Sequence, residues 1–201
     1  MLAGVNGAGK SSIGGAMFRA AGADYYNPDE AAQALMAANP GLDQIRANAA
    51  AWHQGRRLLE KAIAERLDFA FETTLGGSTI PRLLGDAAAH GIEVRVWYVG
   101  LATPEAHIAR VAQRVRTGGH DIPVTTIRRR WRHSRLNLVQ LLPALTELRM
   151  YDNSADADPA TGHAPRPVLV LHLLRGRIVE PSDLSSTPEW AKPIVAAALS
   201  L

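Results

Sequence analysis

Residues 4–11 of this 201-residue chain read GVNGAGKS and leave few choices for its fold. They match the pattern G-x-x-x-x-G-K-[ST] position for position, and a helix-compatible segment follows them. In such a loop the glycines let the backbone wrap around phosphates, and the next helix presents its positive end to the anion. The pattern therefore predicts a strand, an ATP-binding P-loop and a helix. The alternative is a glycine-rich turn with an incidental lysine.

The residues expected to hold ATP are the loop positions and the serines that follow them. Lys10 is expected to reach the β and γ phosphates, and the Ser11 hydroxyl is expected to bind Mg²⁺. The full predicted ATP-binding set is Gly4, Asn6, Gly7, Ala8, Gly9, Lys10, Ser11 and Ser12. Only residues 1–3 precede the loop, a shorter strand than usually leads into a P-loop, which leaves open a natural start upstream of Met1.

Short apolar segments alternate with helical ones along the chain, as in a parallel sheet covered by helices on both faces. We therefore expect an α/β fold, a P-loop NTPase three-layer sandwich with a mostly parallel sheet. The expected strands are residues 1–3, 23–26, 68–73, 93–100 and a segment near 149–151, followed by a hairpin of residues 168–173 and 177–180. The expected helices are residues 10–21, 28–38, 42–67, 79–90, 104–117 and 124–148.

The length of the chain suits one domain. Three prolines within residues 153–167 predict a surface loop. We expect a P-loop core over residues 1–154, which includes an arginine-rich lid at residues 104–135, and a C-terminal loop, hairpin and tail over residues 155–201 in the same domain. There is no cysteine, no export-type segment and no apolar run near the roughly 20 residues that span a bilayer, so we expect a cytoplasmic protein with no membrane partner.

Two acidic positions follow predicted strands. Asn27 and Pro28 suit the start of a helix, and Glu30 suits a capping box, so Asp29 needs no function on structural grounds. The alternative is that Asp29 faces the P-loop from the end of its strand and accepts a proton from an attacking hydroxyl.

The second acidic position ends the segment FETT. Glu72, Thr73 and Thr74 follow an apolar strand, and the ligands of open parallel sheets bind beyond such strand ends. These side chains are therefore candidates for binding the acceptor substrate or for ordering water around Mg²⁺. The alternative is that Glu72 is a solvated charge and that the threonines cap the next helix.

Positive charge is concentrated in one segment of a chain whose formal net charge is only +3. Residues 110–135 contain eight arginines and a single acid, Asp121. Arg110 and Arg114 share one helix face at a spacing that is unfavourable unless an anion lies between them. We expect two arginine faces joined at residues 118–121 to form a hinged lid over the phosphates, with Arg110 and Arg114 as catalytic candidates and His120 and Arg128 as acceptor-binding candidates. A single arginine on such a helix can equally be a solvated surface residue, the interpretation that we favour for Arg116 and Arg130.

The order of motifs resembles the zeta toxin family of P-loop kinases. The segments that carry the resemblance are GVNGAGKSS, NPDE, FETTL, ARVAQRVRTGGHDIP, RRRWRHSRLNL and YDNS, and they cover residues 1–154. The resemblance implies transfer of phosphate from ATP to a hydroxyl of UDP-N-acetylglucosamine, as a toxin whose nucleotide site is blocked by a small antitoxin. It also implies that Asp29 is the catalytic base and that Glu72 and Thr74 bind the substrate. Arg110 or Arg114 corresponds to one catalytic arginine, and one of the arginines at 128–130 to the second.

Two other functions remain open at this stage. The GGHDIP segment departs from the best-studied toxins, which leaves room for a kinase that is not a toxin and that acts on another small molecule, such as a dinucleotide like NAD. The other alternative is a nucleic-acid-binding ATPase whose arginines follow a phosphate backbone. Aromatic residues make up only 5% of the chain, and Trp131 alone lies among the arginines, so base stacking is not expected and no nucleic-acid partner is predicted.

Overall fold

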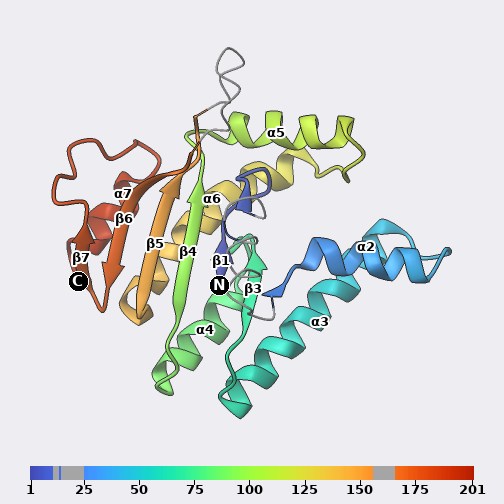
Figure 1. Cartoon of the computed structure of the whole chain (residues 1–201), viewed down its shortest axis with the longest axis horizontal. Coiled ribbons are helices and arrows are strands. Elements are labelled where there is room, and N and C mark those ends of the chain that lie inside the picture. The colour runs from blue at the N-terminus through green and yellow to red at the C-terminus, as the bar shows by residue number, and fades with distance from the viewer. Residues whose placement is uncertain (11–13, 15–24, 156–165) are drawn as a thin grey trace.

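The computed structural model describes residues 1–10, 14, 25–155 and 166–201, and they build a seven-stranded sheet in the order β2-β3-β1-β4-β5-β6-β7 (Figure 1). The first five strands in this order pair in parallel, whereas β6 and β7 pair antiparallel at one edge. The strands are β1 (Leu2–Ala3), β2 (Tyr25–Tyr26), β3 (Ala70–Thr73), β4 (Arg95–Gly100), β5 (Glu147–Asp152), β6 (Val168–Leu174) and β7 (Arg177–Glu180). The expected α/β fold with a mostly parallel sheet is confirmed.

The described helices are α2 (Pro28–Ala38), α3 (Gln44–Glu65), α4 (Thr79–Ala89), α5 (Pro104–Arg116), α6 (Val124–Leu141) and α7 (Lys192–Ala198), with a 3₁₀ turn at Leu142–Ala144. Helices α4, α6 and α7 pack with the central strands around the main core, which contains Leu138, Leu148 and Ile194. Helix α5 crosses the carboxyl ends of the parallel strands (Figure 1). The helix expected at residues 10–21 falls almost entirely outside the described residues.

Helices α2 and α3 form a hairpin that extends away from the sheet (Figure 1). The start of α2 follows from its sequence, because Asn27 accepts a hydrogen bond from the Asp29 backbone N–H at 2.9 Å and Pro28 occupies the first turn. The two helices meet through fully buried alanines, Ala32 with Ala47 and Ala51, whose small side chains allow a close approach. This hairpin carries one wall of the site described below.

The sequence-based prediction was wrong about the end of α6. The helix was expected to continue to residue 148, but it ends at Leu141, and β5 begins at Glu147. Pro143 explains the difference, since proline lacks the N–H that a continuing helix needs and its ring clashes with the carbonyl four residues earlier. The expected strand near residues 149–151 is therefore longer than predicted.

The C-terminal segment packs on the sheet through Trp190. Its ring stacks on Tyr98 with a centroid separation of 6.2 Å, and a Cβ on Gly100 would lie 2.3 Å from the same ring. Gly100 is thus required for this contact, since any larger residue would displace the tryptophan. Helix α7, which follows Trp190, was not predicted from the sequence.

Candidate active site

The loop after β1 has the backbone that its glycines predict. The φ angles are +144° at Gly4, +81° at Gly7 and +86° at Gly9, all in a region that side chains disfavour. A Cβ on Gly4 would also lie 2.3 Å from the carbonyl oxygen of Val99 on β4. Gly4 N–H donates to the Thr73 carbonyl at 3.2 Å, which fastens the loop to the end of β3. Ser11 and Ser12 lie outside the described residues.

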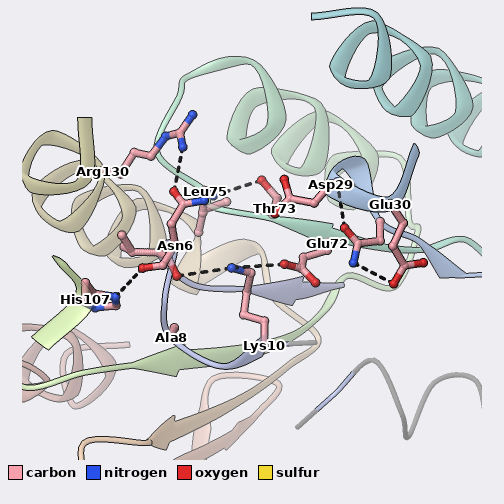
Figure 2. A network of polar contacts seen from close by, with 12 residues as sticks. Asn6, Ala8, Lys10, Asp29, Glu30, Glu72, Thr73, Leu75, His107 and Arg130 are labelled. Atoms are coloured by element: carbon pink, nitrogen blue, oxygen red, sulfur yellow. Dashed lines mark hydrogen bonds and ion pairs between the residues drawn. The ribbon is translucent and has the colours of Figure 1, made fainter. Parts of the chain in front are cut away.

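Lys10 and Glu72 form a buried ion pair at the bottom of the site (Figure 2). The Lys10 Nζ lies 3.3 Å from Glu72 Oε1, and the two side chains are only 6% and 10% exposed. The same Nζ donates to the Val5 carbonyl at 3.3 Å, and Tyr25 Oη donates to the other Glu72 oxygen at 2.7 Å. Burying two charges is favourable only when both are paired and hydrogen-bonded, as they are here. The predicted phosphate lysine is thus joined to the predicted acceptor strand.

The two threonines after Glu72 lie at the end of β3, where the chain turns toward α4. Thr73 Oγ1 accepts a hydrogen bond from the Leu75 backbone N–H at 3.0 Å, and Leu75 itself has a φ of +53°. The Thr73 hydroxyl therefore stabilises the tight turn after β3. Both Thr73 and Thr74 line the cavity described below.

Asp29 faces the loop between α5 and α6. Its Oδ2 lies 3.7 Å from a terminal nitrogen of Arg114, and its Oδ1 lies 4.0 Å from His120 Nε2. The capping role belongs to its neighbours, since Asn27 Oδ1 accepts from the Asp29 N–H and Asn27 Nδ2 donates to Glu30 Oε1 at 3.2 Å (Figure 2). The side chain of Asp29 is 41% exposed. The structural and functional interpretations of this segment are therefore compatible.

A cavity of about 330 Å³ connects these groups. The phosphate loop contributes Asn6 and Lys10, the end of β3 contributes the acidic and hydroxyl side chains, and α2, α3, α6 and the loop before α6 close the remaining walls. The polar side chains of its described lining are Asn6, Lys10, Tyr26, Asn27, Asp29, Asn48, Trp52, Arg56, Glu72, Thr73, Thr74, Thr79, His120, Arg129 and Arg130. Seven predicted site residues thus share one cavity: Asn6, Lys10, Asp29, Glu72, Thr73, Thr74 and His120.

The predicted arginines are placed differently from one another. Arg114 reaches Asp29 and also donates to the His120 carbonyl at 3.2 Å. Arg110 donates to the Ala155 carbonyl at 3.1 Å, and Arg128 pairs with Glu105 on α5 at 2.6 Å. Of the described residues that line the cavity, none is Arg110, Arg114 or Arg128.

Arg130, which was expected to be a solvated surface residue, belongs to the site. It is not a solvated surface residue, because it is partly buried and donates to Asn6 Oδ1 of the phosphate loop at 2.7 Å (Figure 2). Burial lowers the pKa of its guanidinium, as does the nearby Arg129. The signal was present in the sequence: Arg130 lies three residues after Ile127 and four before Ser134, two buried positions of α6, and therefore shares their face.

The wall formed by α3 was also missed. Asn48, Trp52 and Arg56 line the cavity at a spacing of four residues, which places them on one face of the helix. The Arg56 guanidinium carbon lies 5.9 Å from the centre of the Trp52 ring. Helix α3 thus contributes an aromatic and a cationic side chain to the lining of the cavity.

The described part of the site offers groups that suit the phosphates of a nucleotide. Among residues 1–10, 14, 25–155 and 166–201, no three His, Cys, Asp or Glu side chains gather in a way that could hold a metal ion. The positive-φ glycines and Lys10 fit a phosphate chain, while the expected Mg²⁺ ligand, Ser11, is not among the described positions. Within the described part of the chain, no helix is long and apolar enough to cross a membrane.

Comparison of the sequence with known proteins shows the family of the chain. Residues 1–138 match the sequence profile of the family described as AAA domain. An uncharacterized protein of Haemophilus influenzae is 30% identical over 135 residues, which are 64% of this chain and 88% of the relative.

Two solved structures share the fold. A complex of AvrRxo1-ORF1 and AvrRxo1-ORF2 with ATP contains a chain that superposes with a TM-score of 0.67 at 15% identity, over 98% of this chain and 62% of that one. This chain therefore spans less than two thirds of that structure's length. A structure of the PezAT chromosomal toxin–antitoxin system of Streptococcus pneumoniae superposes with a TM-score of 0.54 at 15% identity, over 99% of this chain and 83% of that one. At such identities these likenesses show the fold alone.

Proposed function

The chain belongs to the AAA-domain family of P-loop proteins, and from this premise we propose that it is an ATP-dependent kinase that phosphorylates a hydroxyl of a small acceptor molecule. The observation that carries the proposal is the cavity that joins Lys10 to Asp29 and Glu72. A protein that only hydrolyses ATP needs a site for water beside its P-loop. A cavity of about 330 Å³ lined by carboxylates, hydroxyls and arginines offers room for a second substrate.

The phosphate loop supplies the donor half of the reaction. In this proposal the loop backbone and Lys10 bind the β and γ phosphates, and Ser11 holds the Mg²⁺ that accompanies ATP. The ion's contribution is to neutralise charge on the transferring phosphoryl group. Arg130 contacts the loop through Asn6 and is suited to stabilise the same charge, as is Arg114, which reaches Asp29 from outside the described lining of the cavity.

Asp29 supplies the acceptor half. The acceptor oxygen forms a bond to the γ phosphorus, the bond between that phosphorus and the β–γ bridging oxygen breaks, and the hydroxyl proton passes to the Asp29 carboxylate. Arg114 and His120 lie near this carboxylate, at 3.7 and 4.0 Å. Arg110 and Arg128, proposed from the sequence as catalytic and acceptor-binding residues, remain candidates only if the lid moves them toward the cavity.

For the acceptor we propose a nucleotide-sugar, UDP-N-acetylglucosamine, with the protein acting as a toxin that a small antitoxin inhibits. Support comes from the resemblance of the motifs to zeta toxins and from the shared fold with the PezAT toxin–antitoxin structure and with AvrRxo1-ORF1:ORF2 with ATP. The wall of Asn48, Trp52 and Arg56 adds a surface on which a ring and a negatively charged group can bind.

The distribution of arginine contacts favours a kinase over a nucleic-acid-binding ATPase. Arg128 is paired with Glu105, Arg130 with the phosphate loop, and Arg135 lies 3.4 Å over the Trp131 ring. These side chains point in different directions and are engaged within the chain. Arginines that are held by partners within the chain are less available to a phosphate backbone.

The test is to incubate the protein with ATP, Mg²⁺ and a panel of UDP-sugars and dinucleotides, and to identify products by mass. The proposal expects a gain of one phosphate on a UDP-sugar. Phosphorylation of a dinucleotide would support the kinase activity but contradict the proposed acceptor. A panel that yields no product beyond slow ATP hydrolysis would contradict the kinase activity. Growth arrest on expression, lost in a Lys10→Ala variant, tests the toxin role separately.

A further inference from the structure

Two backbone carbonyl groups of the phosphate loop accept hydrogen bonds from buried side chains of other segments. His107 Nδ1 lies 2.9 Å from the Asn6 carbonyl oxygen, and Asn153 Nδ2 donates to the Ala8 carbonyl at 2.9 Å. His107 is 1% exposed and Asn153 is 7% exposed. Both lie outside the described lining of the cavity, so neither is placed to touch the acceptor. Figure 2 shows His107 beside Asn6, on the opposite side of the loop from the Lys10 side chain.

The direction of each hydrogen bond is fixed by its acceptor. A carbonyl oxygen can only accept, so His107 Nδ1 carries the proton. Burial lowers the pKa of His107 to about 4, despite the hydrogen bond to Asn6 that raises it, and Lys10, Arg110 and Arg135 lower it further. The ring is therefore neutral at neutral pH, in the tautomer protonated on Nδ1. The Asn153 amide likewise presents its nitrogen to the loop.

These bonds also fix where two amide N–H groups of the loop point. In a trans peptide the C=O of one residue and the N–H of the next point in opposite directions. Holding the Asn6 carbonyl outward therefore directs the Gly7 N–H away from His107, and holding the Ala8 carbonyl directs the Gly9 N–H away from Asn153. Gly7 and Gly9 both have positive φ, and glycine has more backbone freedom than any other residue, so these orientations need an external constraint.

Both donors are positioned by the segment after β4. Asn153 donates its own N–H to the Gly100 carbonyl at 3.0 Å, and Ser154 Oγ accepts from the Ala102 N–H at 2.7 Å. Thr103 then caps α5, accepting from the Ala106 N–H at 3.2 Å, and His107 follows one residue later. Helix α5 also contacts the loop directly, because a Cβ on Gly7 would lie 2.7 Å from the His107 carbonyl.

We propose that His107 and Asn153 are positioning residues that hold the Gly7 and Gly9 amides toward the phosphates of ATP. This inference rests on the proposed binding of ATP by the loop. The pair acts through the backbone and not through contact with the substrate. Asn153 lies beyond residues 1–138, the part that matches the AAA-domain family, so this half of the pair is supplied by a later segment of the chain.

The test measures the Kd of a non-hydrolysable ATP analogue with Mg²⁺ by calorimetry, well below the melting temperature of every variant. His107→Asn and His107→Gln form a matched pair, because the Asn amide reaches the position of Nδ1 whereas the Gln amide reaches that of Nε2. We expect His107→Gln and Asn153→Ala each to weaken binding about tenfold, since each loses one buried hydrogen bond to the loop, and His107→Asn to stay within about threefold of wild type.

Ser134→Ala is the control. It removes a buried hydrogen bond of 3.0 Å to Tyr98 away from the loop, so it lowers the melting temperature and leaves the analogue Kd unchanged. Equal binding by wild type, His107→Gln and Asn153→Ala would overturn the proposal, as would a loss of affinity in Ser134→Ala as large as theirs. If the wild-type protein does not bind the analogue, the proposed function is contradicted. If the wild type binds and the variants bind equally well, only the role of His107 and Asn153 is contradicted.

Discussion

The two ends of the cavity are held in different ways. The donor end consists of Asn6, Ala8 and Lys10. Side chains of α5, α6 and the segment after β5 donate short hydrogen bonds to Asn6 and Ala8, and most of the groups involved are buried. At the acceptor end, around Asp29, the contacts to Arg114 and His120 are 3.7 and 4.0 Å long, and the carboxylate is partly exposed. Exposed ion pairs of this kind contribute little to stability.

This difference indicates that the donor end is preorganised and the acceptor end is adjustable. The phosphate loop follows β1 of the sheet, while Asp29 and Trp52 lie on the α2–α3 hairpin that extends away from the sheet, and His120 lies in the loop between α5 and α6 (Figure 1). A fixed donor site beside a movable acceptor site suits an enzyme that closes on its second substrate. Each of the following predictions tests a difference between the donor end and the acceptor end.

The largest effect is expected from Lys10→Met at the donor end. Removing the ammonium should lower kcat/KM on the order of 10³-fold, because a charge that stabilises the transferring phosphoryl group is lost. Binding of the ATP analogue should weaken as well. Glu72→Gln provides the matched comparison, because it breaks the same 3.3 Å ion pair and keeps the lysine. Equal losses of analogue binding in the two variants, measured without acceptor, would mean that the ion pair matters and the phosphate contact does not.

Asp29→Asn should affect the acceptor end alone. We expect kcat to fall on the order of 10²- to 10³-fold through loss of the general base, with analogue binding within about twofold of wild type. Steady-state kinetics and calorimetry on the same preparation measure both quantities. An Asp29→Asn enzyme with normal kcat would remove Asp29 from the role of base.

Arg130→Met tests whether the arginine beside the phosphate loop acts in the reaction. We expect kcat to fall about 10²-fold, because Arg130 contacts Asn6 from within the site, and Arg128→Met, whose partner is Glu105, should change it less than about threefold. The comparison uses single-turnover rates at saturating ATP. The opposite ranking would show that the lid rearranges and that the original prediction for Arg128 was correct.

The smallest effect is a dependence of stability on pH at the donor end. In the folded chain the pKa of His107 is about 4, lowered from 6.5. Between these two pH values the unfolded chain therefore binds a proton at His107 that the folded chain does not bind. This contribution to stability is fully present above pH 6.5 and is lost as the pH falls toward 4. Between pH 7 and pH 5 it should amount to about 2 kcal/mol. Urea unfolding at the two pH values measures it, and a wild-type slope no steeper than that of His107→Asn would refute the assignment.

The sequence predicted those features that depend on neighbours along the chain. Helix α2 begins and ends where expected because Asn27 and Pro28 specify its start, and the hairpin of β6 and β7 turns where Arg175 and Gly176 suit a turn. The phosphate loop follows from its glycines. The helix prediction overlooked two local signals, Pro143 after α6 and the proline in the first turn of α7.

Features that depend on contacts between distant segments could not be predicted in the same way. Asn6 and Arg130 are 124 residues apart, and Ala8 and Asn153 are 145 apart. Nothing in the residues around Asn153 or His107 indicates that they face a glycine loop, because their environment is created when β4 and β5 pair. The three α3 residues of the cavity wall had a visible spacing, but their function depends on where the α2–α3 hairpin lies.

The central claim is that the cavity receives a hydroxyl acceptor beside ATP. Its most direct measurement follows the γ-phosphate of labelled ATP in a single turnover with a UDP-sugar, for wild type and for Asp29→Asn. The account predicts that the wild type places the label on the sugar nucleotide faster than it releases inorganic phosphate, and that Asp29→Asn loses this transfer while still binding ATP. Label that appears only in inorganic phosphate, equally in both proteins, would contradict it.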